Sequence, residues 1–228
     1  YHAEAVIVTA GTFLNGVLHV GDEQTAGGRV DEAAVTGFSE VLHDVLGVEL
    51  GRLKTGTPPR IRTESIDYSR LERQEAHALS SLYEFDAPAD GVHEIMPCYI
   101  AHTTEKTHQI ISKNLHRSAM YSGNIKGTGP RYCPSIEDKI GRYPDRMSHH
   151  VFVEPEGASV AEVYPSGLST SLPRDVQEAY MRSIPGFEKA EFARYGYAVE
   201  YDFIQPTALT HTLETKKLSG LYFAGQIN

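Results

Sequence analysis

Cys133 has the sequence context best suited to covalent chemistry. It precedes Pro134, and proline favours the first position of a helix, so Cys133 is expected to be the N-cap residue of a helix. The positive end of that helix, with Arg131 and Lys139 close in sequence, would favour the thiolate, which is the nucleophilic form of cysteine. The pattern therefore predicts a nucleophile for covalent catalysis. The alternative is a buried, inert thiol, which we expect for Cys98 in its apolar strand context.

A strand followed by a glycine turn lies near each end of the chain. Val6–Val8 is a contiguous β-branched run that predicts a strand covered on both faces, and Gly11 ends it. Residues 221–224 predict a second strand, followed by Gly225 and Gln226. A glycine at such a turn lets the backbone approach a cofactor, and amides at a following helix start attract anions. We expect the two strands to pair in one sheet. A plain strand-to-helix turn is the alternative.

Composition limits the possible classes of protein. The chain has 228 residues, two cysteines and a formal net charge of −9. Two cysteines are too few for a disulfide framework, so a reducing compartment is expected, with a single bridge as the alternative. The acidic balance argues against nonspecific nucleic-acid binding, but local basic faces remain open at Arg52, Lys54, Arg60 and Arg62 and at Lys126, Arg131, Lys139, Arg142 and Arg146. No apolar run approaches the roughly 18 residues of a membrane span, and no cysteine and histidine spacing predicts a metal site.

Hydrophobic periodicity and turn residues predict a mixed α/β chain. Helices are expected at residues 32–46, ended by Gly47, at about 104–115, capped by Thr103 or Thr104, and at 173–184. Strands are expected at 98–103, 151–154, 162–164 and 197–203. Pro58 and Pro59 predict a rigid turn after a strand, and residues 64–94 are expected to be irregular or to form strand and loop.

Several motifs resemble those of known flavoproteins. Thr215 followed by Gly220-Leu-Tyr-Phe-Ala-Gly-Gln226 resembles the last FAD-contacting motif of the glutathione-reductase-type flavoproteins, which usually carry Asp or Glu where this chain has Gln226. Val8-Thr-Ala-Gly-Thr12 resembles their middle motif. The glutamine variant resembles the MnmG/GidA family, as do Gly51-Arg-Leu-Lys-Thr-Gly-Thr-Pro-Pro-Arg60, His102-Thr-Thr-Glu-Lys-Thr-His108 and Gly129-Pro-Arg-Tyr-Cys-Pro-Ser-Ile-Glu-Asp-Lys139.

The resemblance implies an α/β fold. It would be part of a glutathione-reductase-type FAD-binding, Rossmann-like domain with an inserted mixed α/β substrate domain. Residues 1–35 and 200–228 would belong to the FAD-binding domain, and residues 36–199 to the inserted domain for NADH and tRNA. The glycine-rich dinucleotide fingerprint that the family carries at its N-terminus is absent from this sequence. We therefore expect an interior fragment that holds FAD poorly by itself.

The resemblance also implies which residues act. FAD would contact Gly11, Thr12, Gly225 and Gln226, with only a backbone contact at Val35. An NADH segment would include Gly129, Pro130, Arg131, Tyr132, Lys139 and Tyr143. The same loop could instead hold RNA phosphates through Arg131, Lys139 and Arg142, with Tyr132 or Tyr143 stacked on a flipped base. The thiolate of Cys133 would add to C6 of a uracil ring and make C5 nucleophilic.

The implied activity is FAD-dependent modification of the tRNA wobble uridine. A carboxymethylaminomethyl or aminomethyl group would be added at C5 using NADH and methylenetetrahydrofolate, with glycine or ammonia as amine donor. The implied partner is an MnmE-type GTPase, and the enzyme is expected to be a cytoplasmic homodimer. Two alternatives remain: a folate- and FAD-dependent tRNA uracil-5-methyltransferase, and a noncatalytic RNA-binding or partner-docking module.

Overall fold

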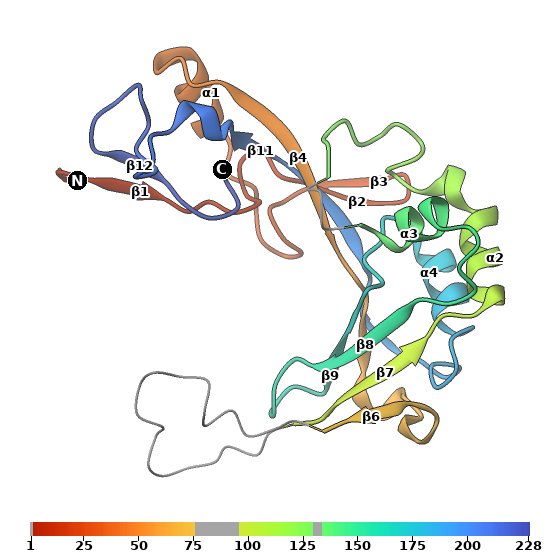
Figure 1. Ribbon diagram of the computed structural model, residues 1–228. Helices are drawn as coiled ribbons and strands as arrows, with labels where there is room; N and C mark the ends of the chain where they lie inside the picture. The colour runs from red at the N-terminus through yellow and green to blue at the C-terminus, as the bar shows by residue number, and fades with distance from the viewer. Residues whose placement is uncertain (1, 76–95, 130–133) are drawn as a thin grey trace, which may run out of the picture.

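The two terminal strands lie side by side. The computed structural model describes residues 2–75, 96–129 and 134–228. In it, β1 (Val6–Val8) pairs in parallel with β12 (Leu221–Phe223), with Val6 opposite Leu221 (Figure 1). The predicted pairing of the two ends is therefore confirmed. The predicted burial of β1 on both faces is wrong, because β12 is its only partner among the described residues and Ile7 is 66% exposed.

A four-stranded antiparallel sheet follows the order β3 (Glu23–Ala26), β2 (Val17–Val20), β11 (Tyr197–Ile204) and β4 (Leu50–Thr57). β4 and β11 pair along their whole length, and together they run from the terminal strands toward the rest of the molecule (Figure 1). Because side chains alternate along a strand, Leu53 and Tyr201 join an apolar cluster on one face. Arg52, Lys54 and Glu200 lie on the other face.

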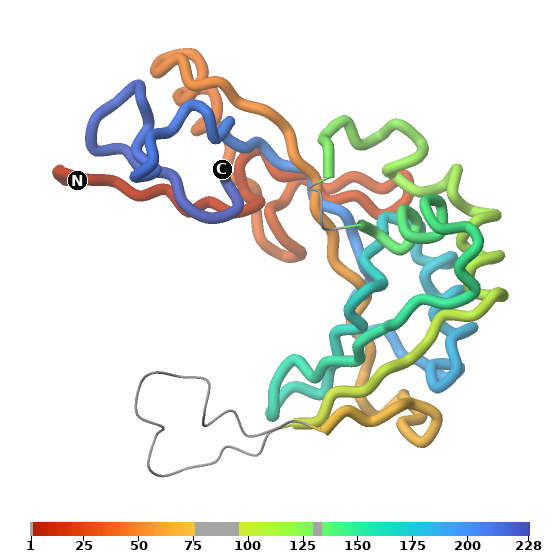
Figure 2. Tube along the Cα trace, viewed as in Figure 1, coloured from red at the N-terminus to blue at the C-terminus, as the bar shows by residue number. Residues whose placement is uncertain are grey.

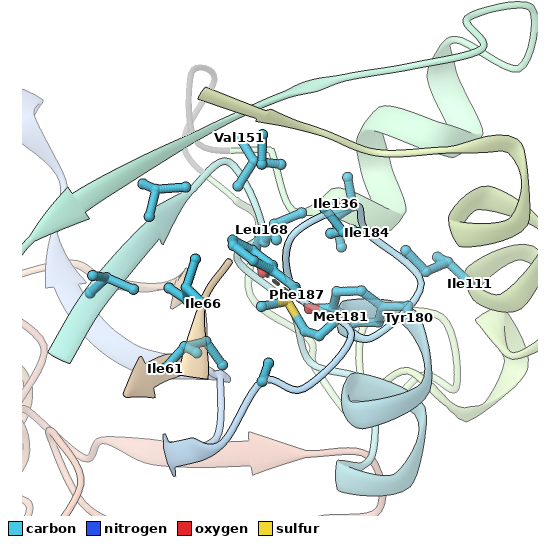
Figure 3. Close-up of a cluster of buried hydrophobic side chains, with 14 of the residues drawn as sticks. Ile61, Ile66, Ile111, Ile136, Val151, Leu168, Tyr180, Met181, Ile184 and Phe187 are labelled. Atoms are coloured by element: carbon cyan, nitrogen blue, oxygen red, sulfur yellow. Dashed lines mark hydrogen bonds between the residues drawn. The ribbon is translucent and has the colours of Figure 1, made fainter. Parts of the chain in front are cut away.

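The largest core lies in the middle of the chain. A six-stranded antiparallel sheet has the order β10 (Phe192–Arg194), β5 (Arg60–Arg62), β9 (Glu162–Ser166), β8 (His150–Pro155), β7 (Cys98–His102) and β6 (Glu72–Gln74). Side chains from α3 (Ile136–Arg142) and α4 (Arg174–Met181) meet those of the sheet in this core, with Tyr180 and Phe187 fully buried (Figure 3). The expected strands and the rigid turn between β4 and β5 are confirmed.

The predicted start of one helix is confirmed, and the predicted start of another is wrong. α2 (Glu105–Lys113) begins where predicted, because Thr104 caps it in a capping box with Thr107. The helix expected from residue 32 instead begins with α1 (Phe38–Glu40) and continues as the π-helical η1 (Val41–Val45). Its predicted start is wrong, because residues 32–37 form an extended and turning segment that ends at Gly37, whose φ is 83°. Gly47, with φ 61°, closes the helix as predicted.

Short 3-10 helices connect these elements at η2 (Thr63–Ser65), η3 (Tyr68–Arg70), η4 (Leu115–Arg117) and η5 (Pro206–Ala208). In the described ranges, no helix is both long and apolar enough to cross a membrane.

The terminal segments share a separate hydrophobic cluster. Leu221 and Phe223 of β12 pack with Leu42 and Val48. Both of these partners lie beyond residue 35, where the first domain segment was predicted to end. The chain trace accordingly shows both ends and the helical turn after residue 37 on one side of the molecule (Figure 2). This cluster extends past the boundary predicted at residue 35, and the division into segments 1–35, 36–199 and 200–228 stays a prediction.

Candidate functional site

The carboxyl ends of β1 and β12 bring two glycine turns to one edge. Ala224 N–H donates to the carbonyl of Val8 at 3.1 Å, which extends the pairing of the two strands toward their turns. Gly11 and Gly225 both have left-handed backbones, with φ of 57° and 84°. A Cβ built at either position meets no atom within 4 Å, so both turns are open on the side where a side chain would stand. Ligands bind at such carboxyl edges in α/β sheets.

The turn at Gly225 also offers hydrogen-bond donors. The backbone N–H groups of Gly225, Gln226 and Ile227 have no hydrogen-bond partner within the described ranges. The carbonyl of Gly225 accepts from Asn228 N–H at 3.2 Å, so the chain here turns like the start of a helix. Successive unpaired amides at a turn of this kind favour an anionic or electron-rich ligand group.

The other three residues expected at FAD are held by the protein itself. Thr12 Oγ1 donates to the carbonyl of Gly28 at 2.7 Å, and Gln226 Nε2 donates to Tyr201 Oη at 3.1 Å. Val35 N–H donates to the carbonyl of Phe13, and its own carbonyl accepts from Asn15 N–H. Both backbone groups of Val35 are thus engaged. The carbonyl oxygen of Val35 keeps a second lone pair, and the backbone contact with FAD expected there stays a prediction.

Gly225→Ala in the full-length protein is expected to weaken FAD binding by about tenfold, since a left-handed backbone disfavours a Cβ by about 1–2 kcal/mol. Gly123→Ala is the matched control, because Gly123 has φ 85° and equally open space but lies in an exposed turn far along the chain. The measurement is the dissociation constant for FAD, taken by flavin fluorescence. Equal FAD affinities in the two variants would contradict a flavin contact at Gly225.

The predicted N-cap of the helix after Cys133 is wrong. Ser135 is the N-cap of α3: its Oγ accepts from Asp138 N–H at 3.2 Å, and Asp138 Oδ2 accepts from Ser135 N–H at 3.1 Å. The capping hydroxyl therefore belongs to Ser135, two residues after Cys133, and Pro134 lies before the cap and outside the helix. Cys133 itself lies outside the described residues, as do Pro130, Arg131 and Tyr132. Support for a thiolate therefore rests on the neighbouring positive charges and not on an N-cap position.

The described residues of the segment expected to bind NADH or RNA lie in different surroundings. Lys139 Nζ donates to the carbonyl of Gly167 at 3.0 Å. Arg142 and Tyr143 are exposed at the end of α3, where the Arg146 guanidinium lies 5.6 Å from the centre of the Tyr143 ring. Gly129 is placed differently: a Cβ there would stand 3.5 Å from Lys54 Cε, and Lys54 is only 3% exposed. Lys54 is therefore buried and does not belong to an exposed basic face.

A buried ionic network is the main feature that the sequence interpretation missed. Arg52 donates to Asp202 Oδ1 at 2.8 Å and to Glu200 Oε2 at 3.3 Å, and Asn15 donates to Asp202 Oδ2 at 2.8 Å. His19 Nε2 lies 3.8 Å from Glu200 Oε2, and burial lowers the pKa of His19. The signal was available, since charges alternate at 52 and 54 and at 200 and 202 in two strand-like runs.

Glu137, in the same motif as Cys133, is fully buried. Its Oε1 accepts from Ser118 Oγ and Thr170 Oγ1, both at 3.1 Å, and from Ser171 N–H at 3.0 Å, whereas Oε2 has no partner. Burial raises the pKa of Glu137 above its ordinary value, against the opposing effect of these hydrogen bonds. Burial thus favours the neutral carboxyl group, whereas the three donors to Oε1 favour the ionised form.

Cys98 has the opposite electrostatic setting to a reactive cysteine. Burial first, and the charge of Glu154 second, raise the pKa of the Cys98 thiol. The thiolate is therefore disfavoured at this position. Across residues 2–75, 96–129 and 134–228, no three histidine, cysteine, aspartate or glutamate side chains are grouped so as to hold a metal ion.

Comparison with known proteins assigns the fold and motifs to one family. The family described as "Glucose inhibited division protein A", GIDA, matches residues 1–228. The chain belongs to this family. The match extends from the open edge of β1 and β12 through the motif around Cys133, so it includes both candidate sites. The GidA structures below share the predicted α/β fold class, which is confirmed.

Individual relatives and solved structures also match the whole chain or nearly all of it. The chain is 53% identical to the "tRNA uridine 5-carboxymethylaminomethyl modification enzyme MnmG" of Rhodopirellula baltica and 52% identical to that of Thermodesulfovibrio yellowstonii, in each case over all of this chain. Two crystal forms of Aquifex aeolicus GidA match 98% of this GIDA-family chain with TM-scores of 0.84 and 0.85, at 45% and 49% identity. The chain spans 35% and 36% of the length of those two relatives.

Proposed function

We propose that the longer protein containing this chain is an FAD-dependent tRNA-modifying enzyme. It would add a carboxymethylaminomethyl or aminomethyl group to C5 of the wobble uridine. The observation that carries the proposal is the match along the whole chain to relatives named for this modification, at about half of all positions. The motif Gly129-Pro-Arg-Tyr-Cys-Pro-Ser-Ile-Glu-Asp-Lys139 favours this reading over the uracil-5-methyltransferase alternative.

The glycine edge fits a flavin. Gly11 and Gly225 leave room for close backbone approach, and the amides of residues 225–227 can donate to an electron-rich ring edge. Thr12 and Gln226 are already held by hydrogen bonds, so their positions are fixed before a ligand arrives. Val35 would contribute a backbone contact. When bound, FAD would supply the redox chemistry of the reaction.

Cys133 is our proposed nucleophile. Its thiolate would add to C6 of the uracil ring, so that C5 becomes able to attack an electrophilic one-carbon unit. Arg131 and Lys139 would favour the thiolate through their charge. The exposed Arg142 and Tyr143 at the end of α3 suit a phosphate and a nucleobase, which supports RNA or nucleotide binding at this end.

The remaining assignments extend the same proposal. NADH would bind at the segment that includes Gly129, Pro130, Arg131, Tyr132, Lys139 and Tyr143. Methylenetetrahydrofolate would supply the one-carbon unit, and glycine or ammonia the amine. An MnmE-type GTPase would be the partner of a homodimeric enzyme in the cytoplasm. Segments 1–35 and 200–228 would form part of the FAD-binding domain around an inserted domain at 36–199.

The test is the modified nucleoside made by the full-length protein. We expect cells lacking the protein to lose 5-carboxymethylaminomethyluridine or 5-aminomethyluridine at the wobble position, and the full-length gene to restore it. Mass spectrometry of digested tRNA measures this directly. Restoration of 5-methyluridine in the T-loop instead would establish the methyltransferase alternative. Colourless purified protein that binds tRNA without flavin would establish the noncatalytic module.

A further inference from the structure

The last residues of β11 contact both the turn after β1 and the turn after β12. Asp202 N–H donates to the carbonyl of Leu14, in the loop after β1, at 2.8 Å. Ile204 N–H donates to the carbonyl of Ile227, in the turn after β12, at 2.7 Å. Figure 1 shows this end of β11 on the side of the molecule that carries β1 and β12. One strand therefore holds both halves of the glycine edge.

A buried carboxylate strengthens the contact with the first turn. Asn15 Nδ2 donates to Asp202 Oδ2 at 2.8 Å, and Arg52 donates both to Asp202 Oδ1 at 2.8 Å and to the carbonyl of Asn15 at 3.2 Å. Asp202 is buried, and hydrogen bonds to a charged group are stronger than neutral ones. Asn15 has a left-handed backbone with φ 46°, which asparagine adopts more readily than most residues. The three side chains thus fix the position of Asn15.

A short folded stretch joins Asn15 to the first turn. Only two residues separate Asn15 from Thr12. Between them, Phe13 N–H donates to the carbonyl of Ala10 at 3.0 Å, and the Phe13 carbonyl accepts from Val35 N–H at 2.8 Å. Because this stretch is hydrogen-bonded and not slack, a displacement of Asn15 also moves Thr12 and the glycine turn before it.

Tyr201 holds the second turn from the opposite face of β11. Its Oη accepts from Gln226 Nε2 at 3.1 Å, and its side chain is fully buried. Successive side chains of a strand point to opposite faces, so Tyr201 and Asp202 reach the two turns from the two sides of one strand. β11 is itself paired along its whole length with β4. The separation of the two turns is therefore set by a well-anchored strand.

We propose that Asp202 and Tyr201 are positioning residues for FAD. Asp202 fixes the first turn through Asn15, and Tyr201 fixes the second turn through Gln226. Together they hold the two glycine turns at the separation that lets both meet the cofactor. Both residues act through the turns and not by contact with the cofactor. This inference rests on the proposed binding of FAD at the glycine edge.

The first test compares Asp202→Ala with Glu200→Ala in the full-length protein. Glu200 is the matched control, because it is also buried on this face of β11 and also pairs with Arg52, but it accepts from the amides of residues 126 and 127 and not from Asn15. Each variant leaves Arg52 with the other carboxylate. The readouts are the dissociation constant for FAD, the visible absorption spectrum of the bound flavin, and the melting temperature of the FAD-free protein.

Asp202→Ala is expected to weaken FAD binding by about tenfold, the size of effect that loss of one hydrogen bond to a charged group can have. The absorption bands of the bound flavin should change as well, because the groups at its edge move. Glu200→Ala should keep the FAD affinity and flavin spectrum of the wild type, even where its melting temperature falls as far as that of Asp202→Ala. Equal losses of FAD affinity in the two variants would overturn the role of Asp202.

Asn15→Gly tests whether the effect of Asp202 passes through Asn15. Glycine accepts the left-handed backbone at this position and removes only the side chain that binds Asp202. The variant should weaken FAD binding by about fivefold, and adding it to Asp202→Ala should cause little further loss, because contacting residues are not additive. Additive losses would overturn this route. Asn15→Gly also replaces Asp202→Ala if that variant does not fold, and wild-type FAD affinity in it would then refute the proposal.

Tyr201→Phe tests the second turn. It removes the hydroxyl that accepts from Gln226 and keeps the buried ring, so FAD binding should weaken by about fivefold. Tyr197→Phe is the matched control, because Tyr197 lies on the same strand and packs against the same apolar cluster. Equal FAD affinities in the two variants would overturn the role of Tyr201.

These measurements separate the inference from the proposed function. Wild-type FAD affinity and flavin spectra in Asp202→Ala, Asn15→Gly and Tyr201→Phe would overturn the inference and leave the proposed function standing. Wild-type full-length protein that binds no FAD would overturn both.

Discussion

Cys133→Ser in the full-length enzyme is expected to abolish tRNA modification while FAD stays bound. A serine hydroxyl is a far weaker nucleophile than a thiolate at neutral pH, so loss of the covalent step should lower kcat by about a thousandfold or more. The flavin should be retained, because Gly11 and Gly225 follow β1 and β12, whose side chains pack in a different hydrophobic cluster from those of α3. The measurements are the nucleoside content of tRNA after reaction and the flavin absorbance of the purified variant.

The control for Cys133→Ser is Cys98→Ser. Burial raises the pKa of the Cys98 thiol, and Cys98 lies at the start of β7, so this variant should keep nearly full activity. A second control is Lys139→Ala, which removes one of the charges expected to favour the thiolate and should shift the pH profile of Cys133 alkylation to higher pH. Normal modification by Cys133→Ser would end the role of Cys133 as nucleophile.

Features that depend on local sequence were predictable. The pairing of β1 with β12 was expected from two apolar runs, each followed by a glycine turn, whereas its parallel direction was not predicted. The turn between β4 and β5 followed from Pro58 and Pro59, and the start of α2 followed from Thr104. In each case a few adjacent residues determine the geometry, because proline restricts φ and a hydroxyl cap satisfies nearby amides.

Features that depend on contacts between distant parts of the chain were not predictable from the sequence. The N-cap at Ser135 is an exception, because its capping box with Asp138 is local and could have been recognised in the sequence. Residues before Gly37 have helical periodicity, but Val35 is drawn into a bridge with Leu14. Lys54 was expected on a basic face, but it is buried and lies beside Gly129, 75 positions later. Such contacts are specified by tertiary packing, which overrides local pattern.

Glu137→Ala is expected to destabilise the region around α3 by about 3–5 kcal/mol. The change removes the one oxygen that accepts from Ser118, Thr170 and Ser171, and it leaves a cavity in a site that is closed to solvent. Each donor left without an acceptor costs about 1–3 kcal/mol, although the two hydroxyls can partly reorient. Hydrogen exchange of the amides in α3 and the six-stranded sheet of the full-length protein measures this local stability.

The same carboxyl group makes stability depend on pH. Burial raises the folded-state pKa of Glu137, whereas an unfolded glutamate titrates near about 4.3. The folded protein therefore keeps a proton that the unfolded chain loses. The stabilisation from this proton is complete below the unfolded pKa and is lost as the pH rises through the folded pKa. Stability in the region of α3 should fall with rising pH across that window.

Glu137→Gln separates the hydrogen bonds from the charge. Glutamine keeps the shape and the accepting oxygen for Ser118, Thr170 and Ser171, but it has no proton to lose. The variant should be close to the wild type in mildly acid solution and progressively more stable than the wild type as the pH rises. Hydrogen exchange at two pH values, corrected for intrinsic rates, measures the difference. The same pH dependence of stability in Glu137→Gln and the wild type would show that the buried carboxyl group is already ionised in the folded protein. In that case the hydrogen bonds from Ser118, Thr170 and Ser171, and not a retained proton, would account for the contribution of Glu137 to stability.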